Sequence, residues 1–347
     1  MPTIRDVALR ANVSIATVSR VINNSAKVSP AVKEAVLKAQ KELNFSPNAN
    51  ARALAQRESN TIGMVVSDVS DPYFATAIRS CDDAIQASGF NLLIAQGHHD
   101  AEREKRAIDS LISYKCRGLV VHALALNDDI MRDYLDRVDS MVLINRVIKG
   151  YEERCLNCDN YAGECLAVGE LIEKGHTKIA FINSSHQILD ASERLQGYVD
   201  TLSKYHLKFD PNLVAEAPPS IEGGAQAIKS LLAKLKPGKD FTAIACYSDV
   251  MAIGAIPVLY SNGFTVPDDI SITGFDNLYL SYCTWPALTT IDNPIKRMAE
   301  EAVNRAITLY SRNPLAPPHR LDVSLVRRDS VKDLNAKILK RKRKVLN

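Results

Sequence analysis

The first 23 residues carry a pattern that few folds can satisfy. Two short amphipathic segments, 3–11 and 15–23, are separated by a turn of only a few residues. Thr3 lies three residues before Asp6, which is capping-box spacing, and Ser14 can cap the second segment. Apolar residues recur at helical spacing on one face of the first segment, at Ile4, Val7, Ala8 and Ala11. The pattern predicts a helix-turn-helix, which binds double-stranded DNA.

The outward face of the second segment is predicted to enter the major groove. Val18, Val21 and Ile22 would face inward. The opposite face is short and mixed, with one long cation, as a recognition helix requires. The predicted DNA contacts of this region are Thr3, Ser14, Ile15, Ala16, Thr17, Ser19, Arg20 and Asn23. A small three-helix bundle without a DNA role is the alternative interpretation.

A third helix is expected after Ser29, which stands at an N-cap position with Pro30 at the first helical position. Its apolar stripe is Val32, Ala35, Val36, Ala39 and Leu43. Phe45-Ser46-Pro47 then breaks the helical pattern. Residues 48–55 have helix-forming content but are too few to be stable alone, so they are expected to order only when docked.

Charge is distributed unevenly along the chain. Residues 1–60 hold nine Lys and Arg against four Asp and Glu, and residues 332–347 hold seven against one. Since the whole chain carries only +3, the region between them is acidic. The basic N-terminal region suits phosphate contacts, whereas the acidic middle argues against DNA wrapping over it. The basic tail is expected to be solvated, with weak DNA contact as the alternative.

Several classes of protein are not indicated. An apolar run long enough to span a membrane is lacking, and Arg5, Asp6 and Arg10 interrupt any signal-peptide pattern. Seven irregularly spaced cysteines suggest reduced thiols and a cytoplasmic location. Cys158 and its neighbours lack the second pair or nearby histidine of a zinc site. Neither a phosphate-binding glycine loop nor a catalytic constellation is visible, so no metal, no cofactor and no enzymatic activity are expected.

From Thr61 onward, short apolar strands alternate with amphipathic helices. Strands are predicted at 62–66, 92–95, 119–122, 141–144, 179–182, 243–246 and 270–273, and helices at positions such as 102–114 and 162–174. Such repeats form parallel sheets covered by helices, and ligands bind at the carboxyl ends of the strands. The residues expected there are carboxylates, amides, an arginine and aromatic rings, a set that suits a sugar.

The segment TIRDVALRANVSIATVSRVINN resembles the headpiece of the LacI/GalR family of bacterial transcriptional regulators. The resemblance covers residues 2–331. It is strongest to the galactose repressor and isorepressor group, through VVSDVSDPYF, ERLQGY, MVLINRVIKGYEERC and LVRRDSV. The resemblance implies a hinge helix that pairs with its twin in the minor groove, where Leu54 would be an apolar wedge. Asn50 and Arg52 are further predicted DNA contacts of this segment.

The resemblance also implies a periplasmic-binding-protein-like effector domain of two α/β subdomains with a ligand cleft. The matching effector-binding positions are Asp71, Tyr73, Phe74, Asn145, Asp190, Arg194, Tyr247, Asp249 and Asp276. His98 and His186 are expected to be solvated loop histidines. Ser248 stands where the family often has Asn, and Trp285 is expected either in the cleft or on the surface.

The predicted organisation is a headpiece at 1–45 and a hinge at 46–59, followed by the effector domain. Its N-subdomain is expected at 60–160 plus 292–320, its C-subdomain at 161–291 plus 321–331, and a basic tail at 332–347. The expected function is a homodimeric repressor of galactose genes that binds a pseudo-palindromic operator and is released by D-galactose. A regulator that responds to another sugar or a purine, a sugar receptor and a sugar-processing enzyme are the alternatives.

Overall fold

The computed structural model describes residues 2–22, 28–45, 60–86 and 88–335. It divides the chain into an N-terminal compact unit and a larger one that begins at Thr61. The first unit consists of α1 (Ile4–Arg10), α2 (Ile15–Ile22) and α3 (Pro30–Glu42). Their common core is Val7, Ala8, Val18, Val21, Val36 and Ala39. The predicted helix-turn-helix is therefore confirmed.

Caps fix where the first two helices begin. Thr3 and Asp6 form the predicted capping box: the Asp6 amide donates to Thr3 Oγ1 at 3.4 Å, and the Thr3 amide donates to Asp6 Oδ2 at 2.7 Å. Ser14 Oγ accepts from the Thr17 amide at 3.1 Å. Between the helices, Asn12 takes a positive φ of 52°, a left-handed conformation that asparagine tolerates.

The expected hydrogen bond to the Ser29 side chain at the start of α3 is wrong. Ser29 occupies the N-cap position of α3 and Pro30 its first turn, but the Ser29 hydroxyl makes no capping hydrogen bond. The Ser29 carbonyl instead accepts from the Lys33 amide at 3.0 Å. The start of α3 therefore depends on proline, whose fixed φ is already helical.

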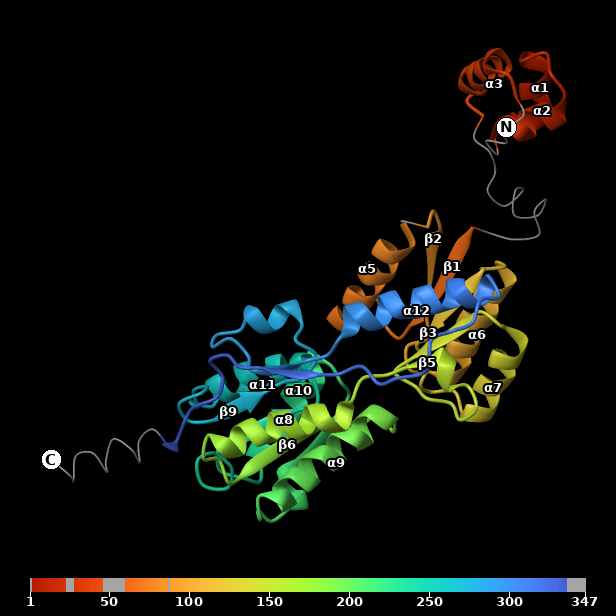
Figure 1. Cartoon of the computed structure of the whole chain (residues 1–347). Coiled ribbons are helices and arrows are strands. Elements are labelled where there is room, and N and C mark those ends of the chain that lie inside the picture. The colour runs from red at the N-terminus through yellow and green to blue at the C-terminus, as the bar shows by residue number, and fades with distance from the viewer. Residues whose placement is uncertain (1, 23–27, 46–59, 87, 336–347) are drawn as a thin grey trace. The chain divides into compact units, whose positions relative to one another are not determined.

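The larger unit contains two lobes, each built on a parallel sheet (Figure 1). The sheet of the first lobe has the order β2-β1-β3-β4-β5. Its strands are β1 (Thr61–Val66), β2 (Asn91–Gln96), β3 (Gly118–Val121), β4 (Met141–Ile144) and β5 (Cys155–Leu156). Its helices are α5 (Pro72–Gln86), α6 (Ala101–Ser113), α7 (Asp128–Arg137) and α12 (Ile295–Tyr310).

In the first lobe, α5 and α12 cover one face of the sheet. Ile62, Met64 and Val66 of β1 alternate toward that face, where they join a core with the apolar sides of both helices. The helix α12 packs there although it follows all the strands of the second lobe's sheet in the sequence.

The second lobe has the strand order β7-β6-β8-β9, with helices on both faces. Its strands are β6 (Ile179–Ser184), β7 (Val214–Ala217), β8 (Ala243–Cys246) and β9 (Ser271–Thr273). Its helices are α8 (Asn160–Glu173), α9 (Leu189–Lys204), α10 (Ile221–Leu232) and α11 (Asp249–Ser261). All seven predicted strands are present, which confirms the predicted fold class; β5 and β7 were not predicted.

Three connections join the lobes: one after β5, one between β10 (Thr290–Asp292) and α12, and one that leads into β11 (Ser324–Val326). The strands β10 and β11 pair antiparallel. The chain remains attached to the second lobe beyond the predicted start of the tail, because the Lys332 amide donates to Ser271 Oγ at 2.9 Å and the Leu334 amide to the Lys174 carbonyl at 2.8 Å. Within the described residues, no helix is both long and apolar enough to cross a membrane.

Two glycines set the distance between α10 and α11. A Cβ built at Gly254 would lie 1.9 Å from the Ile221 carbonyl oxygen, and one at Gly224 would lie 2.1 Å from that of Met251. Because both obstacles are backbone atoms, the helices cannot keep this separation if either glycine gains a side chain.

We predict that Gly254→Ala destabilises the protein by about 1–3 kcal/mol despite the better helix propensity of alanine. The matched control is Gly169→Ala on α8, where a Cβ meets no atom within 4 Å. This control should stabilise by about 0.5–1 kcal/mol. Urea unfolding followed by circular dichroism compares the two variants, and equal midpoints would contradict the packing argument.

Candidate functional site

The outward face of α2 presents the predicted DNA-contact residues to solvent. Ile15 is 44% exposed although it is aliphatic, and Ala16 and Arg20 are exposed beside it. Thr17 and Ser19 are half-buried at the edge of this face. A small apolar group next to an exposed guanidinium provides what base-edge recognition needs: contact with a thymine methyl and a bidentate donor to guanine.

Three predicted DNA residues, Thr3, Ser14 and Thr17, have structural partners as well. The Thr3 hydroxyl donates to Asp6 Oδ2 at 2.8 Å, and the hydroxyls of Ser14 and Thr17 lie 2.8 Å apart. Several predicted features lie outside the described residues. They are the DNA contacts Asn23, Asn50, Arg52 and Leu54, the hinge at 46–59 and the tail beyond Asn335.

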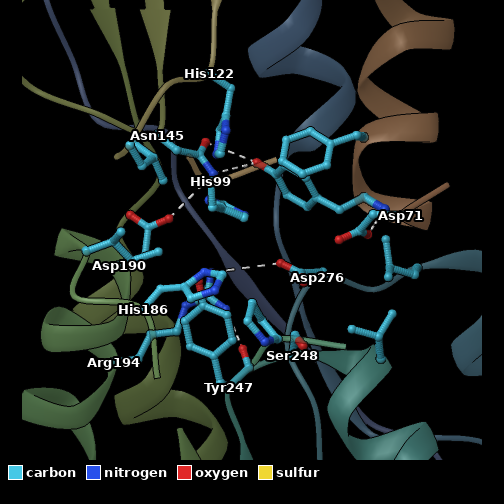
Figure 2. Close-up of a pocket in the computed structure, with 17 residues that line it drawn as sticks. Asp71, His99, His122, Asn145, His186, Asp190, Arg194, Tyr247, Ser248 and Asp276 are labelled. Atoms are coloured by element: carbon cyan, nitrogen blue, oxygen red, sulfur yellow. Dashed lines mark hydrogen bonds and ion pairs between the residues drawn. The ribbon is translucent and has the colours of Figure 1, made fainter. Parts of the chain in front are cut away.

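A cavity of about 60 Å³ lies in the cleft between the two lobes (Figure 2). Of the predicted effector residues, the structure brings eight to its wall: Asp71, Tyr73, Phe74, Asn145, Asp190, Arg194, Tyr247 and Asp276. They come from segments that follow β1, β4, β6, β8 and β9, at the carboxyl ends of both sheets. This is where ligands of parallel sheets bind.

The side chain of Arg194 is the most constrained group in the cleft. It is 3% exposed, and both Nε and Nη2 donate to Asn160 Oδ1, at 2.9 and 2.8 Å. Its guanidinium also donates to the Tyr247 carbonyl and lies 3.6 Å from the centroid of the Phe275 ring. Nη2 is 3.8 Å from Asp276 Oδ1. A planar guanidinium is required here. A lysine ammonium group could not stack on the Phe275 ring and also donate two parallel hydrogen bonds to Asn160.

Two buried carboxylates face this cation. Burial raises the pKa of Asp276 to about 7, although Arg194 opposes the shift, and burial raises the pKa of Asp190 to about 6 against the same opposition. The Asn293 amide donates to Asp276 Oδ1 at 3.0 Å, and the Asn160 amide to Asp190 Oδ1 at 3.2 Å. Both carboxylates keep acceptor capacity for further donors.

The first lobe contributes an amide and a phenol that contact each other. Asn145 Nδ2 lies 2.8 Å from the Tyr73 hydroxyl and 3.5 Å from Asp190 Oδ2, so Asn145 connects the lobes. Asn145 has a positive φ of 58°, which turns it out of β4 toward the cleft. Asp71 Oδ1 accepts from the Tyr73 amide at 2.8 Å and fixes the start of α5.

The predicted effector contact at Asp249 is not supported by its position. Asp249 is fully buried and does not line the cavity. Its two oxygens accept from Thr290 Oγ1 at 2.6 Å and from the Leu278 amide at 2.8 Å. The carboxylate therefore holds the 276–278 loop, which carries Asp276, and acts on the site only through that loop.

Sequence reasoning missed part of the cavity wall. His99, His122 and His186 line it, although His186 was expected to be solvated. His98 is exposed, as expected. Apolar residues complete the wall: Leu124, Ile188, Pro219, Val250 and Leu278. His122 is the last residue of the strand predicted at 119–122, and this place at the carboxyl end of a parallel strand is the signal that could have identified it. The apolar residues carry no such signal.

Two positions left open by the sequence are placed by the structure. Ser248 lines the cavity and caps α11, since its Oγ accepts from the Met251 amide at 3.4 Å. Trp285 is 87% exposed and lies on the surface rather than in the cleft. Across the described residues, no group of three or more His, Cys, Asp or Glu side chains is arranged to hold a metal ion.

A helix-turn-helix unit and a two-lobed domain with a polar cleft together define the class of ligand-responsive DNA-binding regulators. Comparison with known families agrees with this class. Residues 3–48 match the model for bacterial regulatory proteins of the lacI family, and residues 168–331 match the periplasmic binding protein-like domain.

Similar proteins extend the match over nearly the whole chain. The HTH-type transcriptional regulator GalR of Escherichia coli K12 is 45% identical over 95% of this chain and 96% of its own length. GalS of Salmonella typhimurium LT2 is 40% identical over 95% and 97%. The Lac repressor bound to ONPG in the repressed state superposes with a TM-score of 0.84 at 26% identity, over 95% of this chain and 99% of that one. The chain belongs to the lacI family of bacterial regulatory proteins, and these relatives are transcriptional regulators rather than enzymes.

Proposed function

We propose that this protein is a repressor of galactose transport and utilisation genes that D-galactose releases from its operator. The 45% identity to GalR over 95% of the chain is the observation that carries the proposal, because it spans the cleft as well as the DNA-binding unit. The chemistry of the cleft agrees: Asp190, Asp276 and Arg194 offer acceptors and donors to vicinal hydroxyls, and Tyr73 and Phe74 offer apolar ring surface.

The proposed mechanism couples the cleft to DNA through the lobes. Residues of both lobes line the cavity, so a bound sugar would contact both lobes and its binding would depend on how they meet. In a homodimer on a pseudo-palindromic operator, a change in how the lobes meet would lower the affinity for DNA. The sugar acts in this way only if it prefers one arrangement of the lobes.

The direct test is fluorescence anisotropy of the full-length protein on a labelled galactose-type palindromic operator at fixed salt. We expect tight binding that D-galactose relieves and that D-glucose and purine nucleosides leave unchanged. Tight binding that is indifferent to galactose but relieved by another sugar or a purine would favour a different effector. Sugar binding without any specific DNA binding would favour a receptor.

Arg20→Ala is expected to weaken operator binding by about tenfold to a hundredfold, because a bidentate contact to a base edge contributes about 1–3 kcal/mol. Binding to a scrambled duplex should change little. Arg5→Ala on α1 is the control: any phosphate contact it makes should affect both duplexes equally. The anisotropy assay with both duplexes checks this, and an equal loss on both for Arg20→Ala would contradict base recognition.

Galactose affinity is expected to rise from about pH 5.5 to about pH 8. Burial raises the pKa of Asp276 to about 7 and that of Asp190 to about 6, so both carboxylates ionise across this range. An ionised carboxylate accepts a hydroxyl hydrogen bond more strongly than a protonated one, so binding should release protons.

Isothermal titration calorimetry in two buffers of different ionisation enthalpy measures that proton release. Asp276→Asn should bind galactose at least tenfold more weakly and show a flatter pH profile. Asp83→Asn on the exposed side of α5 is the control and should behave like the unsubstituted protein. A wild-type affinity that is independent of pH would contradict the assignment of Asp276.

A further inference from the structure

Three histidines lie in a row through the cleft (Figure 2). His122 follows β3 and His99 follows β2 in the first lobe, whereas His186 follows β6 in the second. The ring centroids of His99 and His122 are 6.0 Å apart, and those of His99 and His186 are 4.3 Å apart. The His99–His186 pair is therefore a direct contact between the lobes beside the cavity.

Two of these imidazoles have a nitrogen without a hydrogen-bond partner among the described residues. Nδ1 of His122, a side chain that is 3% exposed, and Nδ1 of His186 are both buried and unpaired. Buried polar atoms are almost always paired, since an unpaired one costs about 1–3 kcal/mol. Two such atoms on the wall of one cavity indicate that something else supplies the partner.

The same feature recurs in an adjoining chamber. This chamber has a volume of about 440 Å³ and shares His99, His186 and Asp71 with the first cavity. Ser67, which is 3% exposed, lines it, and its hydroxyl is also buried without a partner. The histidine row thus lies where the two spaces meet, and unpaired polar atoms line both.

We propose that His122 and His186 bind hydroxyl groups of the effector directly, and that His99 closes the cleft over it by its contact with His186. The inference rests on the proposed sugar-binding function and adds residues that fix which hydroxyls are recognised. It gives the cleft a type of group that the carboxylates and Arg194 lack.

That type of group is a neutral imidazole. Burial lowers the pKa of His99 to about 4 and that of His122 to about 3, and burial also lowers the pKa of His186. Near neutral pH each ring therefore offers one N–H donor and one lone pair. A hydroxyl also donates and accepts, so an imidazole can match it in either role, whereas Asp276 only accepts when ionised and Arg194 only donates.

The test uses the full-length protein and a series of monodeoxy D-galactoses, each lacking one hydroxyl. His122→Phe and His186→Phe keep a ring and remove both nitrogens, and affinities come from isothermal titration calorimetry. We expect each variant to bind D-galactose about five- to tenfold more weakly. For each variant, one particular deoxy sugar should bind as well as it binds to the wild type. That sugar lacks the hydroxyl that the substituted histidine would contact, so the variant loses nothing further.

The Asn variants separate a lost contact from a disturbed fold. His122→Asn and His186→Asn place an amide near the position of Nδ1 and should recover part of the affinity. His99→Asn should weaken all the sugars by a similar factor, and His98→Asn on the same loop should not. His98 and His99 both have a positive φ, 52° and 53°, a conformation that asparagine accepts. The two substitutions should therefore affect the backbone equally.

Losses of equal size for every sugar in both Phe variants, or no loss at all, would overturn the assignment of direct contacts. Operator binding by each variant checks that the protein is folded. If the wild type binds no D-galactose, the proposed function fails and this inference fails with it. If the wild type binds and the variants show no pairing with a particular hydroxyl, only the histidine inference fails.

Discussion

The buried guanidinium of Arg194 is the group on which the cleft depends. It holds Asn160 at the first connection between the lobes, the Tyr247 carbonyl at the end of β8 and the ring of Phe275 after β9. Removing its charge would leave Asp190 and Asp276 without the cation that opposes the rise in their pKa. One side chain from α9 therefore holds three strand ends in place and stabilises the charges of the site. A buried ion is costly unless it is paired and hydrogen-bonded, so each of these partners matters.

The two lobes also contact each other directly across the cleft. Asn145 approaches Asp190, and His99 approaches His186, each from the opposite lobe. The hydrogen bond between Asn145 and Asp190 is long, at 3.5 Å, so a ligand that offers a better partner can replace it. Two apolar cores lie within the second lobe, whereas the core of the first lobe also includes Val250 and Leu278 from the second.

Sequence reasoning reached the fold because its signals are local. Capping at Thr3 and apolar runs such as Met141–Ile144 follow from neighbouring residues alone. It could not place residues whose contacts come from segments far away in the chain. The structural role of Asp249 depends on Thr290 and Leu278, about thirty to forty residues away, and the place of His186 depends on His99 in the other lobe. The two-residue strand β5 is too short to carry any periodicity.

In the proposed repressor, cleft and operator are coupled through one equilibrium, and coupling of this kind is reciprocal. The most direct measurement is the galactose affinity of the full-length protein with and without saturating operator duplex, by titration calorimetry at fixed salt. From this coupling we expect operator to weaken galactose binding by the same factor by which galactose weakens operator binding. A galactose affinity unchanged by operator, in a protein that galactose releases from DNA, would contradict it.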